Sequence, residues 1–121
     1  MSRATPDVGE VFAALADRTR REVVARVGRG PQRASELAAA LGATRPAMSR
    51  HLRVLRAAGL ITETDDASDG RARLLELAPG AFDGVRAFID EVESYWGAQL
   101  ASFQVLAEAR AATRPARRRA S

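Results

Sequence analysis

The stretch from Ser35 to Leu60, SELAAALGATRPAMSRHLRVLRAAGL, constrains the fold more than any other part of this chain. A short apolar-patterned run, with Ser35 as its expected N-cap, ends at Gly42, a residue type that tolerates the left-handed conformation closing many helices. A second helix is expected to begin shortly afterwards, with Thr44 as its N-cap, Pro46 in its first turn and Gly59 just beyond its end. Two short helices joined by such a turn predict a helix-turn-helix.

The second helix of this pair, which is expected to run to Ala58, has an apolar side and a basic side. Met48, Leu52 and Leu55 recur at helical spacing and form a stripe that must be buried. The other sides carry no acidic residue and instead present Arg45, Ser49, Arg50, Arg53 and Arg56. Arg can pair with guanine through two hydrogen bonds and Ser can bond bases or phosphates, so these sides suit the major groove of DNA. The alternative is a solvated basic face on a helix that only packs.

Beyond Gly59 the pattern changes from helical to extended. Residues 60–64 are rich in β-branched side chains, residues 65–70 have the composition of a turn, and residues 71–77 can return as a second strand. A helix-turn-helix followed by a hairpin predicts a winged helix, in which the wing lies along DNA beside the docked helix. Arg71 and Arg73 are the candidate contacts, with solvated arginines on an edge hairpin as the alternative.

The expected wing also carries three acidic residues near its tip, Asp65, Asp66 and Asp69. Carboxylates repel the phosphates of DNA. Either the tip stays clear of DNA, or the wing contributes little to binding.

Helices are also expected on both sides of this region. The first begins with the Thr5 hydroxyl as its cap, Pro6 at its first position and Asp7 in its first turn, and places Val8, Phe12 and Leu15 on one side. The second follows a cap at Asp17 and ends near Val27. The last is long, from about residue 81 to residue 109. Its apolar residues follow a heptad seam formed by Phe82, Val85, Ile89, Val92, Trp96, Phe103 and Leu106. This seam exceeds what the edge of a winged-helix body needs, so it favours a homodimer interface over a helix folded back on its own domain.

The length of 121 residues suits a single domain. The net charge of +4 comes from the end of the chain, because five of the 19 arginines lie within residues 110–119. The rest of the chain has 14 arginines and 15 acidic residues, a net charge of −1. We therefore expect a domain at residues 1–109 and a basic, disordered tail at residues 110–121. No apolar run approaches the roughly 18 residues that span a membrane, and no signal peptide begins the chain, so the expected location is the cytoplasm.

The same segments resemble a known protein family. TRPAMSRHLRVLRAAGLI is similar to the recognition-helix segment of the ArsR-type winged helix-turn-helix transcriptional regulators, and VFAALADRTRREVVARV is similar to the opening of these proteins. The resemblance is close over residues 8–77 and loose over the last helix. It implies a small homodimeric DNA-binding regulator, mostly a repressor in this family, whose first and last helices form the dimer. It also implies base and phosphate contacts at Arg45, Ser49 and Arg50, with Arg53 further along.

Neither catalysis nor metal binding finds support in the sequence. His51 is the single histidine and Cys is absent, so no catalytic triad, thiolate site or disulfide can form. Family members that sense metals use Cys before the recognition helix, or His and carboxylates on the last helix. The last helix here offers only carboxylates such as Asp90, Glu91 and Glu93, which fit a solvated face. We therefore expect no metal site and no cofactor. If a signal regulates the protein, we expect it to be a small-molecule effector bound near Trp96, a partner protein or the expression level of the protein itself.

The sequence thus predicts a mainly α winged helix-turn-helix with a small β-hairpin and a long C-terminal dimerisation helix. Its predicted function is that of a transcriptional repressor binding a palindromic operator on double-stranded DNA as a homodimer. The alternative is a winged-helix protein-interaction module without DNA binding. Predicted DNA contacts are Arg45, Pro46, Ser49, Arg50, His51, Arg53, Arg71 and Arg73, of which His51 has a packed or capping role as its alternative. The predicted dimer interface comprises Val8, Phe12, Leu15, Phe82, Val85, Ile89, Val92, Trp96 and Phe103.

Overall fold

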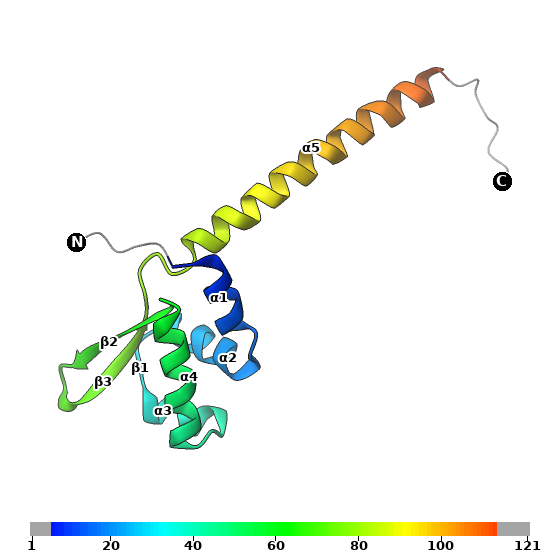
Figure 1. The fold of residues 1–121 in the computed structure, drawn as a ribbon. Helices are drawn as coiled ribbons and strands as arrows, with labels where there is room; N and C mark the ends of the chain where they lie inside the picture. The colour runs from blue at the N-terminus through cyan, green and yellow to red at the C-terminus, as the bar shows by residue number, and fades with distance from the viewer. Residues whose placement is uncertain (1–5, 114–121) are drawn as a thin grey trace. The chain divides into compact units, whose positions relative to one another are not determined.

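A computed structural model describes residues 6–113, apart from the side chains of Asp69 and Arg71. Its elements are α1 (Val8–Leu15), α2 (Arg18–Val27), β1 (Gln32–Arg33), α3 (Ala34–Leu41), α4 (Arg45–Ala57), β2 (Ile61–Asp66), β3 (Asp69–Leu77) and α5 (Asp83–Thr113) (Figure 1). The chain divides into two units, Met1–Arg86 and Ala87–Ser121, and the division falls near the start of α5. The predicted class is confirmed: helices dominate, and α3 and α4 are followed by the β2–β3 hairpin.

The helix-turn-helix is built by local signals that the sequence displays. The Thr44 hydroxyl accepts a hydrogen bond from the Ala47 backbone N–H at 3.2 Å, which caps α4. Gly42 ends α3 with a φ of 64°, a left-handed conformation in which a side chain would be strained. Asp17 caps α2 in the same way as Thr44 caps α4, by accepting from the Arg20 N–H at 3.0 Å. These three predicted helix ends are therefore confirmed.

Two helix starts differ from the expectation. The N-cap of α1 is Asp7, whose carboxylate accepts from the Glu10 N–H at 3.0 Å, while residue 5 lies outside the described residues. The predicted cap of α3 at Ser35 is wrong, because the helix already begins at Ala34. The Glu36 carboxylate reaches back to accept the Arg33 N–H at 3.0 Å, and this bond organises the first turn instead.

The sheet of the first unit has three antiparallel strands in the order β1-β3-β2. The predicted hairpin is present, but β2 extends to Asp66, further than expected, and a bulge falls between Asp65 and Asp66. Strand β1 was not predicted, since its two residues are too few to show any alternation. Its pairing of Arg33 with Leu74 attaches the start of α3 to the central strand β3.

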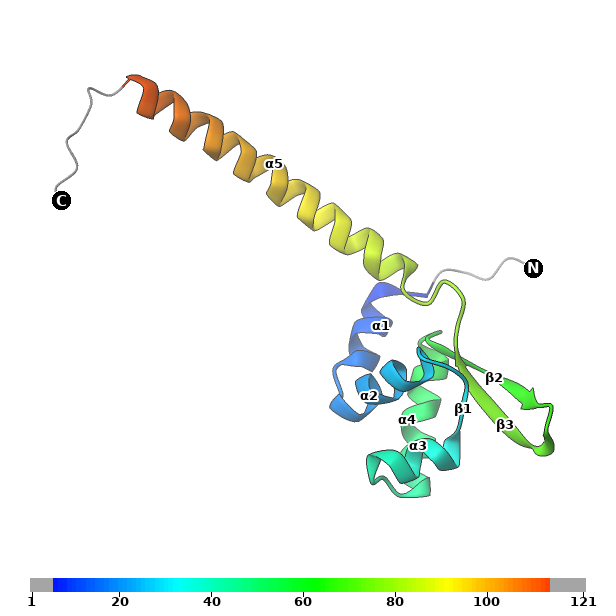
Figure 2. The same ribbon diagram turned by 180° about the vertical axis from the view of Figure 1, so that it is seen from behind.

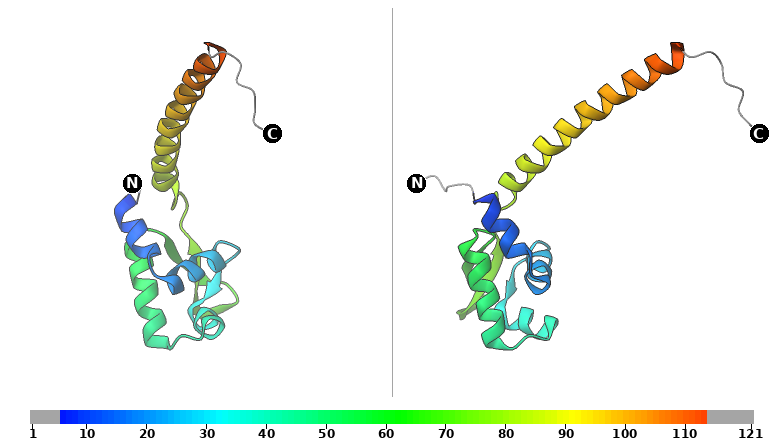
Figure 3. Two further views of the ribbon diagram at one scale, coloured as in Figure 1. Left: turned by 90° about the vertical axis from the view of Figure 1, so that its right-hand side faces the viewer. Right: turned by 45° about the vertical axis from the view of Figure 1, so that its right-hand side comes forward.

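The core of the first unit lies where α1, α2, α3 and α4 meet each other and the sheet. Figure 2 shows α1, α2 and α4 from behind, and Figure 3 shows α4 running along one side of this body. The largest fully buried side chains come from all of these elements: Val11, Val23, Leu37, Met48, Leu55, Leu60 and Leu75. The predicted inward stripe of α4 is confirmed, because Met48, Leu52 and Leu55 are all buried.

The second unit contains the greater part of α5, a single uninterrupted helix of 31 residues. The helix extends past the expected end at residue 109 to Thr113, and residues 114–121 of the expected tail lie outside the described residues. Large apolar side chains are exposed along it, namely Phe88, Ile89, Val92, Tyr95, Trp96, Leu100, Phe103, Val105 and Leu106. No helix within residues 6–113 combines the length and apolarity needed to cross a bilayer.

Candidate nucleic-acid interface

One side of α4 is polar and solvent-exposed from its first residue into its third turn. It presents Arg45, Pro46, Ser49, Arg50 and Arg53, all exposed, while the opposite side is buried in the core. The helix keeps this orientation because its apolar residues recur every three or four positions and its start is fixed by the Thr44 cap. Pro46 occupies the first turn, where no intrahelical N–H bond is lost. The five predicted contacts on this face are therefore brought together.

The arginines of this face differ in how they are paired. Arg45, Arg50 and Arg53 form no hydrogen bond or ion pair with any residue in the described part of the chain. Arg56, in the last turn of α4, donates instead to the Glu63 carboxylate on β2. The part of α4 from Arg45 to Arg53 thus carries unneutralised guanidinium groups, whereas the guanidinium group of Arg56 in the last turn is neutralised by the wing.

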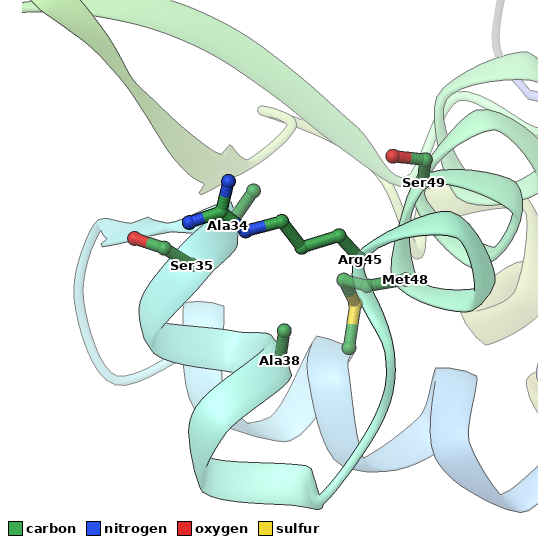
Figure 4. Close-up of a pocket in the computed structure, with 6 residues that line it drawn as sticks. All are labelled: Ala34, Ser35, Ala38, Arg45, Met48 and Ser49. Atoms are coloured by element: carbon green, nitrogen blue, oxygen red, sulfur yellow. The ribbon is translucent and has the colours of Figure 1, made fainter.

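A groove of about 310 Å³ separates the starts of α3 and α4. Figure 4 shows the Arg45 side chain extending from α4 toward Ala34 and Ser35, and the Met48 side chain pointing toward Ala38. Small side chains on α3 leave this space open beside Arg45. Sequence reasoning did not place α3 beside the exposed face of α4. The small, polar residues at its start were visible, but their nearness to Arg45 depends on how the two helices cross.

His51 does not lie on the polar face of α4. Its Nδ1 atom is 3.5 Å from Arg20 Nη1 and 3.8 Å from the Asp17 carboxylate, and its side chain is only 21% exposed. The same Arg20 donates to the carbonyl oxygens of Ala14 at 2.6 Å and Ala13 at 3.3 Å. The structure therefore places His51 in its alternative role, packed between α4 and the corner formed by α1 and α2.

The same corner contains the Asp17 carboxylate. The hydrogen bond that this carboxylate accepts from the Arg20 backbone N–H lowers the pKa of Asp17, and the nearby side chains of His51 and Arg20 lower it further.

The acidic wing tip is less exposed than the sequence suggests. Asp65 is exposed, but Asp66 is buried and accepts hydrogen bonds from Arg33 and Ser68. The bonds from the Ser68 hydroxyl and N–H, followed by that from Arg33, lower the pKa of Asp66 to about 2. Arg73 is 65% exposed, and its Nη1 lies 3.7 Å from the Glu63 carboxylate. The side chains of Asp69 and Arg71, the remaining predicted wing residues, lie outside the described ones.

The predicted dimer residues fall into two groups. Val85 is buried in the core of the first unit, and Val8, Leu15 and Phe82 are partly buried against this core. Val85 therefore offers little surface to a second chain. Phe12 is 42% exposed, and Ile89, Val92, Trp96 and Phe103 are exposed on α5. The seam that remains accessible thus begins at Ile89, and it is flanked by apolar residues that the heptad count omitted, such as Tyr95 and Leu100.

Several known proteins are similar to this chain in both sequence and fold. Residues 15–64 match the model of a helix-turn-helix domain. The chain is 36% identical to the HTH-type transcriptional regulator Rv2034 of Mycobacterium tuberculosis over 102 residues, which are 84% of this chain and 88% of that protein. An ArsR-like transcriptional regulator from Rhodococcus sp. RHA1 is 31% identical, with a TM-score of 0.67 over 82% of this chain and 91% of that one.

The chain belongs to the ArsR family of winged helix-turn-helix transcriptional regulators. As an ArsR-family protein it is a DNA-binding regulator, and α4 is the second helix of its helix-turn-helix, the recognition helix. A homodimeric winged helix-turn-helix domain from Mycobacterium bovis shares the fold, with a TM-score of 0.57 at 22% identity over 72% of this chain and 78% of that one. In this ArsR-family chain, no group of three or more His, Cys, Asp or Glu among residues 6–113 is placed to hold a metal ion.

Proposed function

We propose that the chain is a transcriptional repressor that binds a palindromic operator as a homodimer and inserts one recognition helix into each major groove. The observation that carries this proposal is the exposed face of α4. Arg45, Arg50 and Arg53 have no partner among the described residues, and no acidic residue interrupts them. An array of unpaired guanidinium groups on a rigid helix favours contact with phosphates and base edges.

Within this face we assign sequence reading to Ser49 and Arg50. Both lie within the first two turns of α4, the part of a recognition helix that approaches base edges. Arg50 can bind a guanine through two parallel hydrogen bonds, which is the commonest specific contact in the major groove. Arg45 and Arg53 flank them and contact phosphates, which fixes the register of the helix on the duplex.

The homodimer is supported by the apolar surface of α5. Ile89, Val92 and Trp96 are between 40% and 58% exposed, and similar side chains continue to Leu106. Burying one such side chain fully stabilises by about 1.5–3 kcal/mol, so pairing two copies of this helix relieves a substantial cost. A two-fold symmetric dimer reads two half-sites related by symmetry, about 10 base pairs apart or a multiple of this spacing.

The experiment that tests this function begins with genome-wide footprinting of the native protein, which supplies the operator. Operator affinity is then measured for the wild type, Arg50→Ala, Ser49→Ala and the control Arg18→Ala. Arg18 is a highly exposed arginine at the start of α2, and its one ion pair to a described residue is with Glu22, so its loss removes the same charge away from the proposed interface. Arg50→Ala is expected to cost about 1–3 kcal/mol of specific binding, and Arg18→Ala is expected to change it little.

The salt dependence and a reporter assay complete the test. Specific binding should weaken steeply with added salt, since released counterions must be taken up again. For a repressor, deleting the protein should raise transcription from the footprinted promoter. The proposed function is wrong if Arg50→Ala and Ser49→Ala both leave operator affinity unchanged.

A further inference from the structure

We propose that the ion pair between Arg33 and Asp66 positions the wing for DNA, so that Asp66 strengthens operator binding although it carries the same sign of charge as phosphate. This inference rests on the proposed function. It concerns a residue that neither the family resemblance nor the composition of the wing marks as useful.

Both oxygens of Asp66 are fully engaged within the protein. One oxygen accepts from Arg33 Nε at 2.9 Å and from Arg33 Nη2 at 2.6 Å. The other accepts from the Ser68 N–H at 2.9 Å and from the Ser68 hydroxyl at 2.7 Å. With an exposed fraction of 8%, Asp66 is the only buried polar or charged residue among those the structure describes. Its charge is therefore directed inward, away from any ligand of the wing.

The pair joins two segments that the fold would otherwise hold loosely. Arg33 ends β1 and precedes α3, the first helix of the helix-turn-helix, and Asp66 ends β2 at the bulge near the wing tip. Since β3 lies between β1 and β2 in the sheet, the Arg33 side chain crosses the central strand to reach Asp66. Backbone pairing alone gives weak support here, because β1 has only two residues and the register shifts at the bulge.

Physical considerations favour geometry over stability as the role of this pair. The Asp66 carboxylate is largely removed from water, which costs desolvation energy, and the Arg33 side chain is still 37% exposed, so solvent screens the attraction; the pair itself therefore adds little stability. A fork of two N–H donors on one carboxylate oxygen is strongly directional, however, and holds the two backbones in one relative orientation. Asp66 is therefore a positioning residue: it acts through Arg33 on the angle between the wing and the helix-turn-helix, and Arg73 on β3 moves with that angle.

The competing view is that acidic residues at the tip simply repel DNA. The neighbours Asp65 and Asp66 separate the two views, because Asp65 is exposed and has no partner in the described part of the chain. Asp65→Asn and Asp66→Asn remove the same charge from adjacent positions with almost no change in side-chain size. Repulsion predicts tighter operator binding for both variants. Positioning predicts weaker binding for Asp66→Asn alone.

The experiment measures operator affinity and hydroxyl-radical footprints for the full chain and four variants, after circular dichroism has verified folding. Asp66→Asn is expected to weaken binding by about tenfold, equivalent to one charge-assisted contact with phosphate. Asp65→Asn is expected to bind as well as the wild type or better. Arg33→Lys, which keeps the charge but loses the fork, should weaken binding like Asp66→Asn. Combining Arg33→Lys with Asp66→Asn should weaken it no further, because both act through one contact.

The footprint distinguishes positioning from general destabilisation. Asp66→Asn should lose protection of the DNA backbone where the wing lies and keep protection of the backbone that flanks the recognition helix, whereas partial unfolding would lower both together. Equal effects of Asp65→Asn and Asp66→Asn, or an unaltered wing footprint, would overturn the positioning role. If Arg50→Ala weakens binding and Asp66→Asn does not, the positioning role alone fails. If the wild type binds no operator, the proposed function fails and the positioning role falls with it.

Discussion

Glu63 on the wing binds Arg56 on the recognition helix, and this contact joins the two parts of the molecule that are proposed to face DNA. Arg56 Nη1 donates to one carboxylate oxygen, and Arg73 Nη1 lies 3.7 Å from the other. A single carboxylate therefore sits between two guanidinium groups on the side of the protein that carries the proposed interface. The Glu63 carboxylate is electrostatically unfavourable for the proposed DNA binding, because it partly neutralises two guanidinium groups that would otherwise attract phosphates.

Replacing Glu63 with Gln should therefore raise the affinity for DNA of random sequence. Arg56 and Arg73, freed from Glu63, can each add about one phosphate contact, and each added contact makes the affinity depend more steeply on salt. Fluorescence anisotropy on random duplexes at several salt concentrations measures both quantities. Glu76→Gln is the matched control, because Glu76 lies on β3 of the same hairpin and has no ion pair to a described residue. Equal gains from the two variants would mean that net charge alone is responsible.

The stability of the protein should decrease in acid partly because of Asp66. Its pKa lies near 2 in the folded chain, against 3.8 for an ordinary aspartate, so the unfolded chain binds more protons between these values. The free energy of unfolding should therefore fall as the pH is lowered from about 4 to about 2. Urea unfolding of Asp66→Asn should show a shallower decline over this interval. An unchanged decline in Asp66→Asn would contradict the assignment.

Trp96→Asp should dissociate the proposed homodimer, because it places a charge within the exposed apolar stripe of α5. Trp96 is 58% exposed, so the substitution should spare the fold of the single chain. Operator affinity should fall with dimerisation, since one half-site offers only one recognition helix. Sedimentation velocity at the concentrations used for DNA binding measures the assembly. Ala101→Asp provides the control: it adds the same charge on the opposite side of the helix. A wild type that is monomeric yet binds its operator tightly would refute the dimer.

Two glycines with left-handed backbones should respond differently to substitution by Ala. Gly42 has a φ of 64°, and an added Cβ would meet no neighbouring atom within 4 Å, so Gly42→Ala should cost about 1–2 kcal/mol of backbone strain alone. At Gly59, with a φ of 77°, the new methyl group would lie 3.0 Å from the Pro6 ring. Gly59→Ala should therefore cost more, because Pro6, just before α1, must also move by a few tenths of an ångström. Thermal unfolding of both variants measures the difference, and equal losses would contradict it.

The parts of this fold that local chemistry determines were predictable from the sequence. Thr44 and Asp17 cap helices through bonds to residues only three positions away, and Gly42 ends a helix by its own conformation. Helical spacing likewise identifies the buried stripe of α4. Such signals depend on neighbours along the chain, so they survive without knowledge of the tertiary structure.

The contacts that organise the interface in space were not predictable in this way. Asp66 meets Arg33 across 33 positions of sequence, and His51 meets Arg20 across 31. Composition alone places Asp66 in an acidic wing tip that would repel DNA. In the structure, its carboxylate is instead turned toward Arg33, next to the bulge at the end of β2. The partner of Arg56 also depends on how the hairpin returns beside α4. A pattern of charges shows which residues can pair, but only the packing of the elements shows which do.

Arg20 contacts two other helices with a single side chain, and this makes the first helix and the recognition helix interdependent. Its Nε and Nη2 atoms hold the last carbonyls of α1, while Nη1 reaches His51 on α4. A rotation of α1 away from α2 stretches these bonds and disturbs the surroundings of His51. The energy of α1 in any given orientation thus depends on where α4 lies. In the proposed homodimer, a movement of α1 at the subunit contact would therefore reach the surroundings of the recognition helix through one guanidinium group.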